Sequence, residues 1–256
     1  MKRLYALLMA VILASCVSPK GESASDQEAA HARASAKIHV ELAASYYERS
    51  QYAISLQEIE IAMRADSKYA PAYSMRGLVR MALLEDKEAE EDFHYSLKLD
   101  KDNSETHNNY GWFLCQRGRD RVGIDQLLVA IKNPLYTTPE AAWLNAGICS
   151  KKAGRLKEAD QYLQRALVLH PNLPGALFGL ADLSFMNGDY SGAKRYFSRF
   201  VQVQQMAQNL NAEQLLLGVK IERKMGDRDA EASYVMQLRK RFPDAREIQL
   251  LNHIER

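Results

Sequence analysis

The sequence predicts an all-α fold, an elongated array of about six helical hairpins, because three patterns recur along it together. A small residue returns every 34 to 37 positions, a second small residue follows most of these twelve positions later, and a turn signal separates the two. Apolar residues in these segments follow helical spacing, as at Leu163, Ala166 and Leu167. A single hairpin cannot bury its apolar face alone, so neighbouring hairpins are expected to stack into a solenoid.

The small residues define the repeating units. The first of each pair stands at Ala43, Gly77, Gly111, Gly147, Ala181 and Gly218. The second stands at Ser55, Ala89, Gly123, Ala159 and Ala193, and a third set follows at Ala62, Ser96, Ala130 and Ala166, with Phe200 departing from the pattern. Glycine in a helix interior costs about 1 kcal/mol relative to alanine unless packing requires it, so these glycines are predicted at close helix contacts.

Turn residues mark where the predicted helices end. Glycines separate the two helices of the later units, at Gly118, Gly154, Gly188 and Gly226. The units begin near residues 36, 70, 104, 140, 174 and 211, and an amphipathic segment from Ala245 to Ile254 is predicted to cap the array. The first unit is the weakest, with Ser55 and Ser67 at pattern positions, and the turn at Gly226 is predicted to be irregular. The alternative is a generic helical bundle in which this spacing is accidental.

The N-terminus carries the marks of a secretory signal. Lys2 and Arg3 precede a short apolar stretch that ends in Leu13-Ala14-Ser15-Cys16. That stretch is too short to cross a bilayer as a helix, which takes roughly 20 residues. The aliphatic, small, small, Cys order resembles a bacterial lipobox, which implies that residues 1–15 are a lipoprotein signal peptide and that Cys16 carries a covalent lipid. The alternative is an ordinary signal peptide that contains a cysteine.

The region after the signal divides into two parts. Residues 16–25 are expected to be the acylated N-terminus and a flexible tether, and residues 26–256 to be the helical array, with Asp26 as the cap of a long, alanine-rich first helix. Loss of Lys2 and Arg3 leaves 32 basic and 32 acidic residues, and this balance gives no electrostatic basis for binding nucleic acid. Nothing after residue 16 is long and apolar enough to span a membrane, so the expected membrane link is the lipid alone.

The sequence contains no pattern of catalytic or metal-binding residues. The histidines are His31, His39, His94, His107, His170 and His253, and none has a His or Cys partner at metal spacing on one helical face. Phosphate-binding loops, dinucleotide-binding loops and nucleophile elbows are missing from the sequence. We therefore expect a protein that is not an enzyme, has no metal site, binds no small-molecule substrate and has no cofactor other than the lipid.

The period and the small-residue pattern resemble the tetratricopeptide repeat (TPR). The fourth unit matches best, at Trp143, Ala146, Gly147, Gly154, Ala159, Leu163, Ala166 and Pro171. The resemblance implies a right-handed solenoid that binds other proteins on its concave side, which the first helix of each unit lines. The inward positions are expected at Val40, Tyr47, Leu78, Met81, Trp112, Leu144, Ile148, Phe178 and Phe185, with about half of them in the core instead. Asn109 and Asn145 share one inward position, but Leu144 and Phe178 stand where a carboxylate clamp would need basic residues.

Two further cysteines, Cys115 and Cys149, fall in the first helices of adjacent units. First helices lie side by side in such an array, and disulfides persist in the oxidising compartment to which a secretory signal leads. The sequence leaves two alternatives open, a disulfide between them or two buried thiols that pack as small apolar residues.

The whole chain after the signal resembles the PilF/PilW pilotins of type IV pili. The stretches that carry this likeness are His107 to Gly111, Phe113 to Cys115, Asn145 to Gly147 with Cys149, and Leu238 to Pro243. The resemblance implies a helper for outer-membrane insertion and multimerisation of the pilus secretin, held by its lipid at the periplasmic face of the outer membrane. Val17 after the acylated cysteine favours that membrane by resemblance to other lipoproteins. The alternatives are a lipid-anchored adaptor that presents substrates to periplasmic proteases or cell-wall enzymes, and a structural bridge between envelope components.

Overall fold

The computed structural model describes residues 24–204 and 210–254, and this part of the chain forms helices and no strands. The helices are α1 (Ala24–Glu48), α2 (Tyr52–Ala65), α3 (Ala70–Ala82), α4 (Asp86–Leu99), α5 (Ser104–Gln116), α6 (Asp120–Lys132), α7 (Pro139–Lys152), α8 (Leu156–Leu169), α9 (Pro174–Met186), α10 (Tyr190–Val203), α11 (Ala212–Met225), α12 (Arg228–Arg241) and α13 (Arg246–Ile254). Each odd-numbered helix from α1 to α11 packs chiefly on the helix that follows it. The result is the predicted array of six hairpins with a terminal helix.

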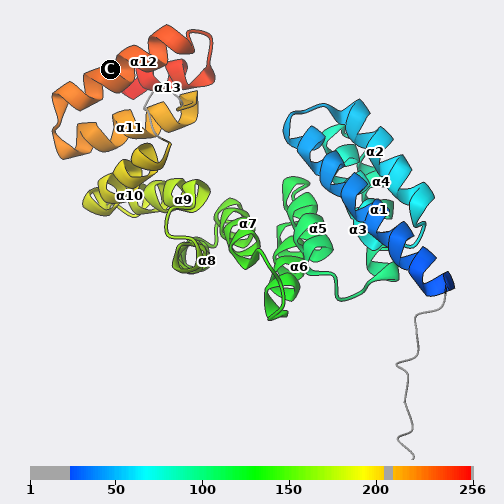
Figure 1. Ribbon diagram of the computed structural model, residues 1–256. Coiled ribbons are helices and arrows are strands. Elements are labelled where there is room, and N and C mark those ends of the chain that lie inside the picture. The colour runs from blue at the N-terminus through cyan, green and yellow to red at the C-terminus, as the bar shows by residue number, and fades with distance from the viewer. Residues whose placement is uncertain (1–23, 205–209, 255–256) are drawn as a thin grey trace, which may run out of the picture.

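The hairpins stack into a curved solenoid (Figure 1). The first helices of adjacent units contact one another, α3 with α5, α5 with α7 and α7 with α9. Helices α1–α4 and α11–α13 rise on either side of α5–α8, so the array has a concave side between its two ends. None of the described helices combines the length and the apolar character needed to cross a bilayer.

Close helix contacts confirm the role assigned to the small residues. A Cβ on Gly147 would lie 2.6 Å from Leu163 Cγ of the partner helix, and one on Gly111 would lie 2.8 Å from the Gly123 carbonyl oxygen. In the first unit Ala43 takes the place of Gly111 and Ser55 that of Gly123, and the Ser55 hydroxyl donates to the Ala43 carbonyl at 2.8 Å. A buried hydroxyl with a partner costs little, so the first unit keeps the contact with a serine.

The turns inside the hairpins share one backbone conformation. Gly118, Gly154, Gly188 and Gly226 all have positive φ angles, from 74° to 79°. Glycine adopts this left-handed conformation without the steric cost that a Cβ brings, which is why it follows helix ends so often. Ser50 and Leu84 occupy the same place in the first two units, with φ angles of 58° and 64°.

Three expectations differ from the structure in detail. The turn at Gly226 is as regular as the others, and the departure lies instead in the longer connection between Val203 and Ala212. The long first helix is present, but α1 begins at Ala24, so Asp26 lies in its first turn rather than at its cap. The last two residues of the expected tether are therefore helical. The rest of that tether, the signal peptide and Cys16 lie outside the described residues.

The terminal helix α13 covers the end of the array, as predicted. It packs on α11, and Leu251 is fully buried there. Phe200, which departs from the small-residue pattern, is also buried and lies with its ring centre 5.4 Å from that of Phe178. In this unit two aromatic rings therefore pack between α9 and α10, where the first four units have a small residue.

Candidate functional site

A pocket of about 310 Å³ lies on the first helices of the first three units, and we call it the N-terminal pocket. Its lining residues are Val40, Ala44, Tyr47, Glu48, Pro71, Ser74, Met75, Leu78, Asn103, Glu105, Thr106 and Asn109. They come from α1, from α3 and from the start of α5, so three consecutive units build the site. The volume is at the lower end of the roughly 300–1,000 Å³ range of small-ligand pockets. A pocket of this size can hold a few side chains of a partner protein.

One wall of the N-terminal pocket is apolar. Val40 and Tyr47 stand two helical turns apart on α1, and Met75 and Leu78 face them from α3. Burial raises the pKa of the Tyr47 hydroxyl, with the nearby Tyr52 as a second cause, so this side chain stays neutral at physiological pH. The wall therefore offers apolar surface whose burial against a partner would be favourable by about 25 cal/mol per Å².

The opposite wall is polar and belongs to the first turns of α5. Asn103 caps this helix, since its side-chain oxygen accepts from the Thr106 backbone N–H at 2.9 Å. Asn109 follows further along the helix and donates to Ser74 of α3 at 3.2 Å. These contacts fix the polar wall against the apolar one and leave Glu105 exposed at the edge.

Asn109 belongs to a chain of side-chain amides on α5 and α7, which the Ser74 hydroxyl extends to α3. Asn108 donates to the Asn109 side-chain oxygen at 3.3 Å, and Asn145 of α7 donates to the Asn108 side-chain oxygen at 2.9 Å. Both asparagines of α5 are buried. The amide chain holds adjacent units in register and ends at the pocket.

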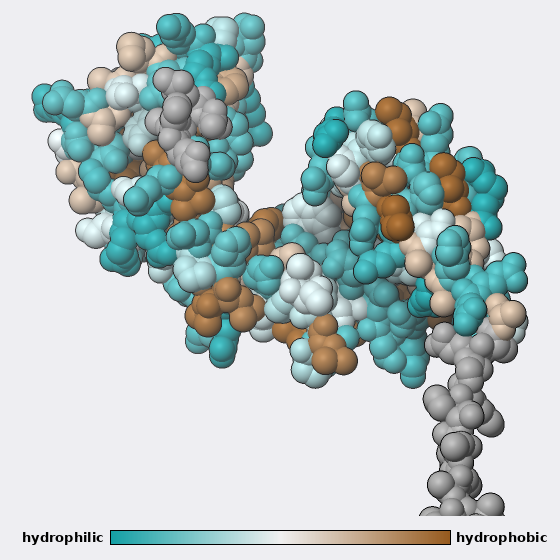
Figure 2. Space-filling view, in the orientation of Figure 1, coloured by the Kyte–Doolittle hydropathy of each residue, from teal (hydrophilic) through white to brown (hydrophobic). Residues whose placement is uncertain are grey.

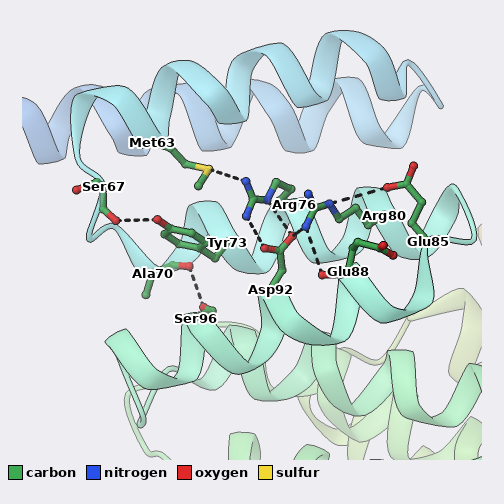
Figure 3. A network of polar contacts seen from close by, with 10 residues as sticks. All are labelled: Met63, Ser67, Ala70, Tyr73, Arg76, Arg80, Glu85, Glu88, Asp92 and Ser96. Atoms are coloured by element: carbon green, nitrogen blue, oxygen red, sulfur yellow. Dashed lines mark hydrogen bonds and ion pairs between the residues drawn. The ribbon is translucent and has the colours of Figure 1, made fainter.

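A buried ion pair behind the pocket fixes α3, as Figure 3 shows. Asp92 of α4 is buried, and its carboxylate accepts from Arg76 at 2.6 and 2.9 Å and from Arg80 at 2.8 Å. The hydrogen bond to the Asp92 carboxylate raises the pKa of Arg76, so this guanidinium stays charged. Arg76 also donates to the Met63 sulfur at 3.6 Å, which links α2 to the same network. Removing one partner of a buried pair leaves an uncompensated charge, so loss of either Arg76 or Asp92 is expected to weaken the packing of α3 on α4.

A second pocket, of about 390 Å³, lies near the other end between α9, α11 and α13. Its lining mixes apolar and charged side chains, at Phe178, Asp182, Glu213, Leu216, Leu217, Lys220, Arg246, Glu247 and Leu250. A larger hollow, of about 890 Å³, is lined by side chains of α12 among the residues that the structure describes. Figure 2 shows an open hollow between the two ends of the array, mostly hydrophilic on this face with separate hydrophobic patches.

Comparison with known proteins identifies the family. The tetratricopeptide-repeat family matches residues 141–173 and 175–203. The crystal structure of PilW, described as a widely conserved type IV pilus biogenesis factor, is 34% identical, with a TM-score of 0.73, and the match covers 84% of this chain and 97% of that one. The chain belongs to the PilF/PilW family of tetratricopeptide-repeat proteins of type IV pilus biogenesis.

A second relative, PilF of Pseudomonas aeruginosa, agrees in both sequence and structure. The type IV pilus assembly protein PilF of Pseudomonas aeruginosa is 29% identical over 244 residues, which is 94% of either chain. A structure of Pseudomonas aeruginosa PilF is 27% identical, with a TM-score of 0.77, and the match covers 87% of this chain and 99% of that one. The likeness thus extends over the whole described array rather than over a single repeat.

The PilF/PilW-type array brings together only part of the set expected on its concave side. Val40, Tyr47 and Leu78 line the N-terminal pocket, and Phe178 lines the second one. The remaining five line neither pocket, namely Met81, Trp112, Leu144, Ile148 and Phe185.

Three of those five pack inside the array instead. Met81 packs on the buried cluster around Phe93, and Phe185 lies with its ring centre 5.4 Å from that of Tyr190. Leu144 packs toward the next unit, where a Cβ on Gly175 would lie 3.0 Å from it. The polar wall of Asn103, Glu105 and Thr106 was not predicted, although the capping pattern at the start of α5 was visible in the sequence.

The structure joins Cys115 of α5 and Cys149 of α7 in a disulfide, with their Cα atoms 5.7 Å apart. Both residues are buried. With Asp120 they form a group of metal-ligand type among the described residues, but both sulfur atoms are engaged in the bond. The disulfide closes a loop of one full unit and connects the third unit to the fourth.

Proposed function

We propose that this chain is a lipid-anchored pilotin, which carries the type IV pilus secretin to the outer membrane and promotes its multimerisation. The observation that carries the proposal is the N-terminal pocket with its apolar wall. This pocket lies at the end of the PilF/PilW-family array that comes first after the lipobox in the chain. Shared membership with proteins described as pilus assembly and biogenesis factors supplies the biological setting. In this proposal the chain acts as a scaffold and performs no catalysis.

The anchor in this proposal is the lipid on Cys16. Each methylene buried in the bilayer contributes about 0.8 kcal/mol, and stable anchoring takes two acyl chains or a second signal. Residues 17–23 separate Cys16 from α1, and seven extended residues reach at most about 25 Å. Val40 lies sixteen residues beyond the start of α1, which adds about 24 Å along the helix. The N-terminal pocket therefore works within about 50 Å of the lipid, at the periplasmic face of the outer membrane that Val17 favours.

The mechanism follows from tethering. A partner segment seated in the pocket is held at the membrane, so its later encounters there occur at a raised local concentration without any new contact. The ion pairs that join α3 to α4 favour a preformed pocket wall, which limits the ordering cost of binding. The scaffold thus changes where the secretin subunits assemble and how often they meet.

The decisive experiment combines a deletion with matched variants of α1. Deletion is expected to leave the secretin synthesised but monomeric or in the inner membrane, with surface pili lost. Val40→Lys together with Tyr47→Lys is expected to reproduce that phenotype with unchanged helix content, because both side chains lie in the apolar wall. Ile38→Lys is the control, since Ile38 lies on the same helix, is 56% exposed and does not line the pocket.

Two results would contradict the proposal. Normal secretin multimers in the outer membrane of the deletion strain would reject the pilotin role and favour the adaptor for periplasmic enzymes. A phenotype from Ile38→Lys as severe as that of the Val40 and Tyr47 pair would show that the N-terminal pocket is not the relevant surface. A pull-down from solubilised envelope with the chain as bait identifies the partner in either case.

A further inference from the structure

The two walls of the N-terminal pocket differ in chemistry, and that difference restricts what the pocket can bind. The apolar wall of α1 and α3 can bury side chains, whereas the polar wall of α5 presents amide and carboxylate groups. An occupant must therefore be apolar on one side and offer hydrogen-bonding groups on the other. A purely apolar ligand would take water away from the exposed Glu105 carboxylate without replacing the hydrogen bonds that water makes there, which costs free energy.

The charges at the pocket have one sign. Glu48 of α1 and Glu105 of α5 line it, and none of the described lining residues is a lysine or an arginine. The Tyr136 hydroxyl holds one oxygen of Glu105 at 3.2 Å. Both glutamates are exposed, so each can pair with a cation on an occupant. Charge complementarity thus favours a basic residue beside the apolar side chains and disfavours an acidic one.

The side-chain amide of Asn109 can bind a peptide main chain. Its nitrogen has two N–H groups, and one of them donates to Ser74, while its oxygen accepts from Asn108. The second N–H has no acceptor among the described residues. A backbone carbonyl of a bound segment would satisfy it, and such a carbonyl is free in an extended chain but engaged in a helix.

The spacing of side chains along an extended chain also fits the two walls of the pocket. Side chains at positions i and i+2 of an extended segment point to the same side, so two of them can enter one apolar pocket while the main chain faces the other wall. We propose that the N-terminal pocket binds an extended segment of the partner protein, with two apolar side chains at i and i+2 and a lysine or arginine beside them. This inference rests on the proposed role of the pocket as the partner-binding site, and it specifies the chemistry of the segment.

Selection from a random linear peptide library on phage tests the proposal and does not require the partner to be identified first. The bait is the purified chain from residue 17 onward, immobilised through a C-terminal tag. Enriched peptides are expected to carry apolar residues at i, i+2 spacing with an adjacent Lys or Arg, and to lose binding to the Val40→Lys variant. Apolar spacing of i, i+3 or i+4, acidic flanks, binding that survives Val40→Lys, or no enrichment over a bait-free control would each overturn it.

Two sets of variants test the charge and the amide separately, with an enriched peptide measured by fluorescence anisotropy. Glu48→Gln with Glu105→Gln is expected to weaken binding about three- to tenfold, and 1 M salt is expected to remove the difference. Asn109→Ala is expected to weaken binding about fivefold, the equivalent of one hydrogen bond. Asn145→Ala is the matched control, because it breaks the same amide chain without lining the pocket.

The control also protects against misreading a folding defect. If Asn109→Ala and Asn145→Ala weaken binding equally, the amide chain acts only through structure and the main-chain contact is rejected. Unchanged affinity of the glutamine pair rejects the charge preference. A failed library selection combined with a secretin defect in the deletion strain rejects this inference while leaving the proposed function standing. A successful library selection combined with normal secretin multimers in the deletion strain rejects the proposed function and leaves this inference standing.

Discussion

Leu84 holds in the second unit the left-handed backbone conformation that Gly118 holds in the third, with φ angles of 64° and 77°. The amide of the residue after each one bonds a carbonyl in the last turn of the preceding helix, Glu85 to Arg80 and Arg119 to Leu114, both at 2.9 Å. The two turns therefore have the same hydrogen bonds, and only the leucine carries a Cβ in a conformation that disfavours it.

Leu84→Gly is expected to stabilise the protein. The leucine side chain is 77% exposed, so its removal loses little burial, while a left-handed residue with a Cβ costs about 1–2 kcal/mol. The greater freedom of glycine in the unfolded chain offsets part of the gain, which leaves about 0.5–1 kcal/mol. Thermal unfolding by circular dichroism measures the change. A lower melting temperature for Leu84→Gly would mean that the side chain makes a stabilising contact at the turn.

Gly147→Leu is expected to destabilise the fourth unit by at least about 1–3 kcal/mol. A Cβ alone would lie 2.6 Å from Leu163 Cγ, so the partner helix must move. Gly154→Leu is the matched control, because its ideal Cβ meets nothing within 4 Å and the variant reports only the cost of the positive φ. If the two variants melt at the same temperature, the close approach of α7 to α8 is not what requires glycine at position 147.

The disulfide predicts a difference in stability between oxidised and reduced protein. A cross-link that spans 34 positions stabilises by roughly 3–4 kcal/mol in the chain-entropy treatment. Denaturant unfolding with and without a dithiol reductant should show that difference, and the variant with Cys115→Ser and Cys149→Ser should not respond to the reductant. Labelling of both thiols in denatured, unreduced protein taken from the periplasm would show that the bond is not formed there.

Glu90 predicts a loss of stability in acid. Although burial raises the pKa of its carboxyl, hydrogen bonds from Tyr110 at 2.7 Å and Arg119 at 2.6 Å lower it below the ordinary 4.5. A group with a lowered pKa in the folded state stabilises the protein above its ordinary pKa, and this contribution is lost as the pH falls through the folded value. The difference in melting temperature between the wild type and Glu90→Gln should therefore be greatest at neutral pH and should shrink below about pH 4.5. A difference that stays constant down to pH 3 would contradict the assignment.

Cys16→Ala is expected to release the folded chain from the membrane fraction. The prediction rests on the lipobox, and a companion variant whose residues 1–16 are replaced by a cleavable signal without cysteine removes any anchoring by an uncleaved signal. Flotation in a density gradient at high salt separates the two fractions. Should the companion variant still float with outer membranes, a surface of the array and not the lipid would be the anchor.

The fold was largely predictable because each turn and contact is encoded locally. The units expected at 70, 104 and 174 begin at Ala70, Ser104 and Pro174, since caps, prolines and turn residues mark these helix starts in the sequence itself. The start of α1 was placed two residues late because an aspartate is favourable both at a helix cap and in the first turn, so its position alone does not fix the boundary.

The site was harder to predict, and Leu78 and Met81 show why. They lie three positions apart on α3 and both pack on the core around Phe93, yet only Leu78 also lines the pocket. Side chains three residues apart on a helix point in directions that differ by about 60° around the helix axis. This difference is enough to place one of them at the pocket and the other beside it. The repeat period alone does not distinguish two directions so close together. The polar wall depends in addition on how α3 and α5 stack, and the sequence of a single helix does not specify that.

The bond between Cys115 and Cys149 also determines how the array responds to mechanical load. A stack of repeats is held together unit by unit, so tension along its length opens the weakest junction first. The disulfide removes the junction between the third and fourth units from that competition, because these units cannot separate without breaking a covalent bond. A pull between the N-terminal and C-terminal ends is therefore expected to open one of the other junctions, and these include the junctions between units one, two and three, whose first helices build the N-terminal pocket.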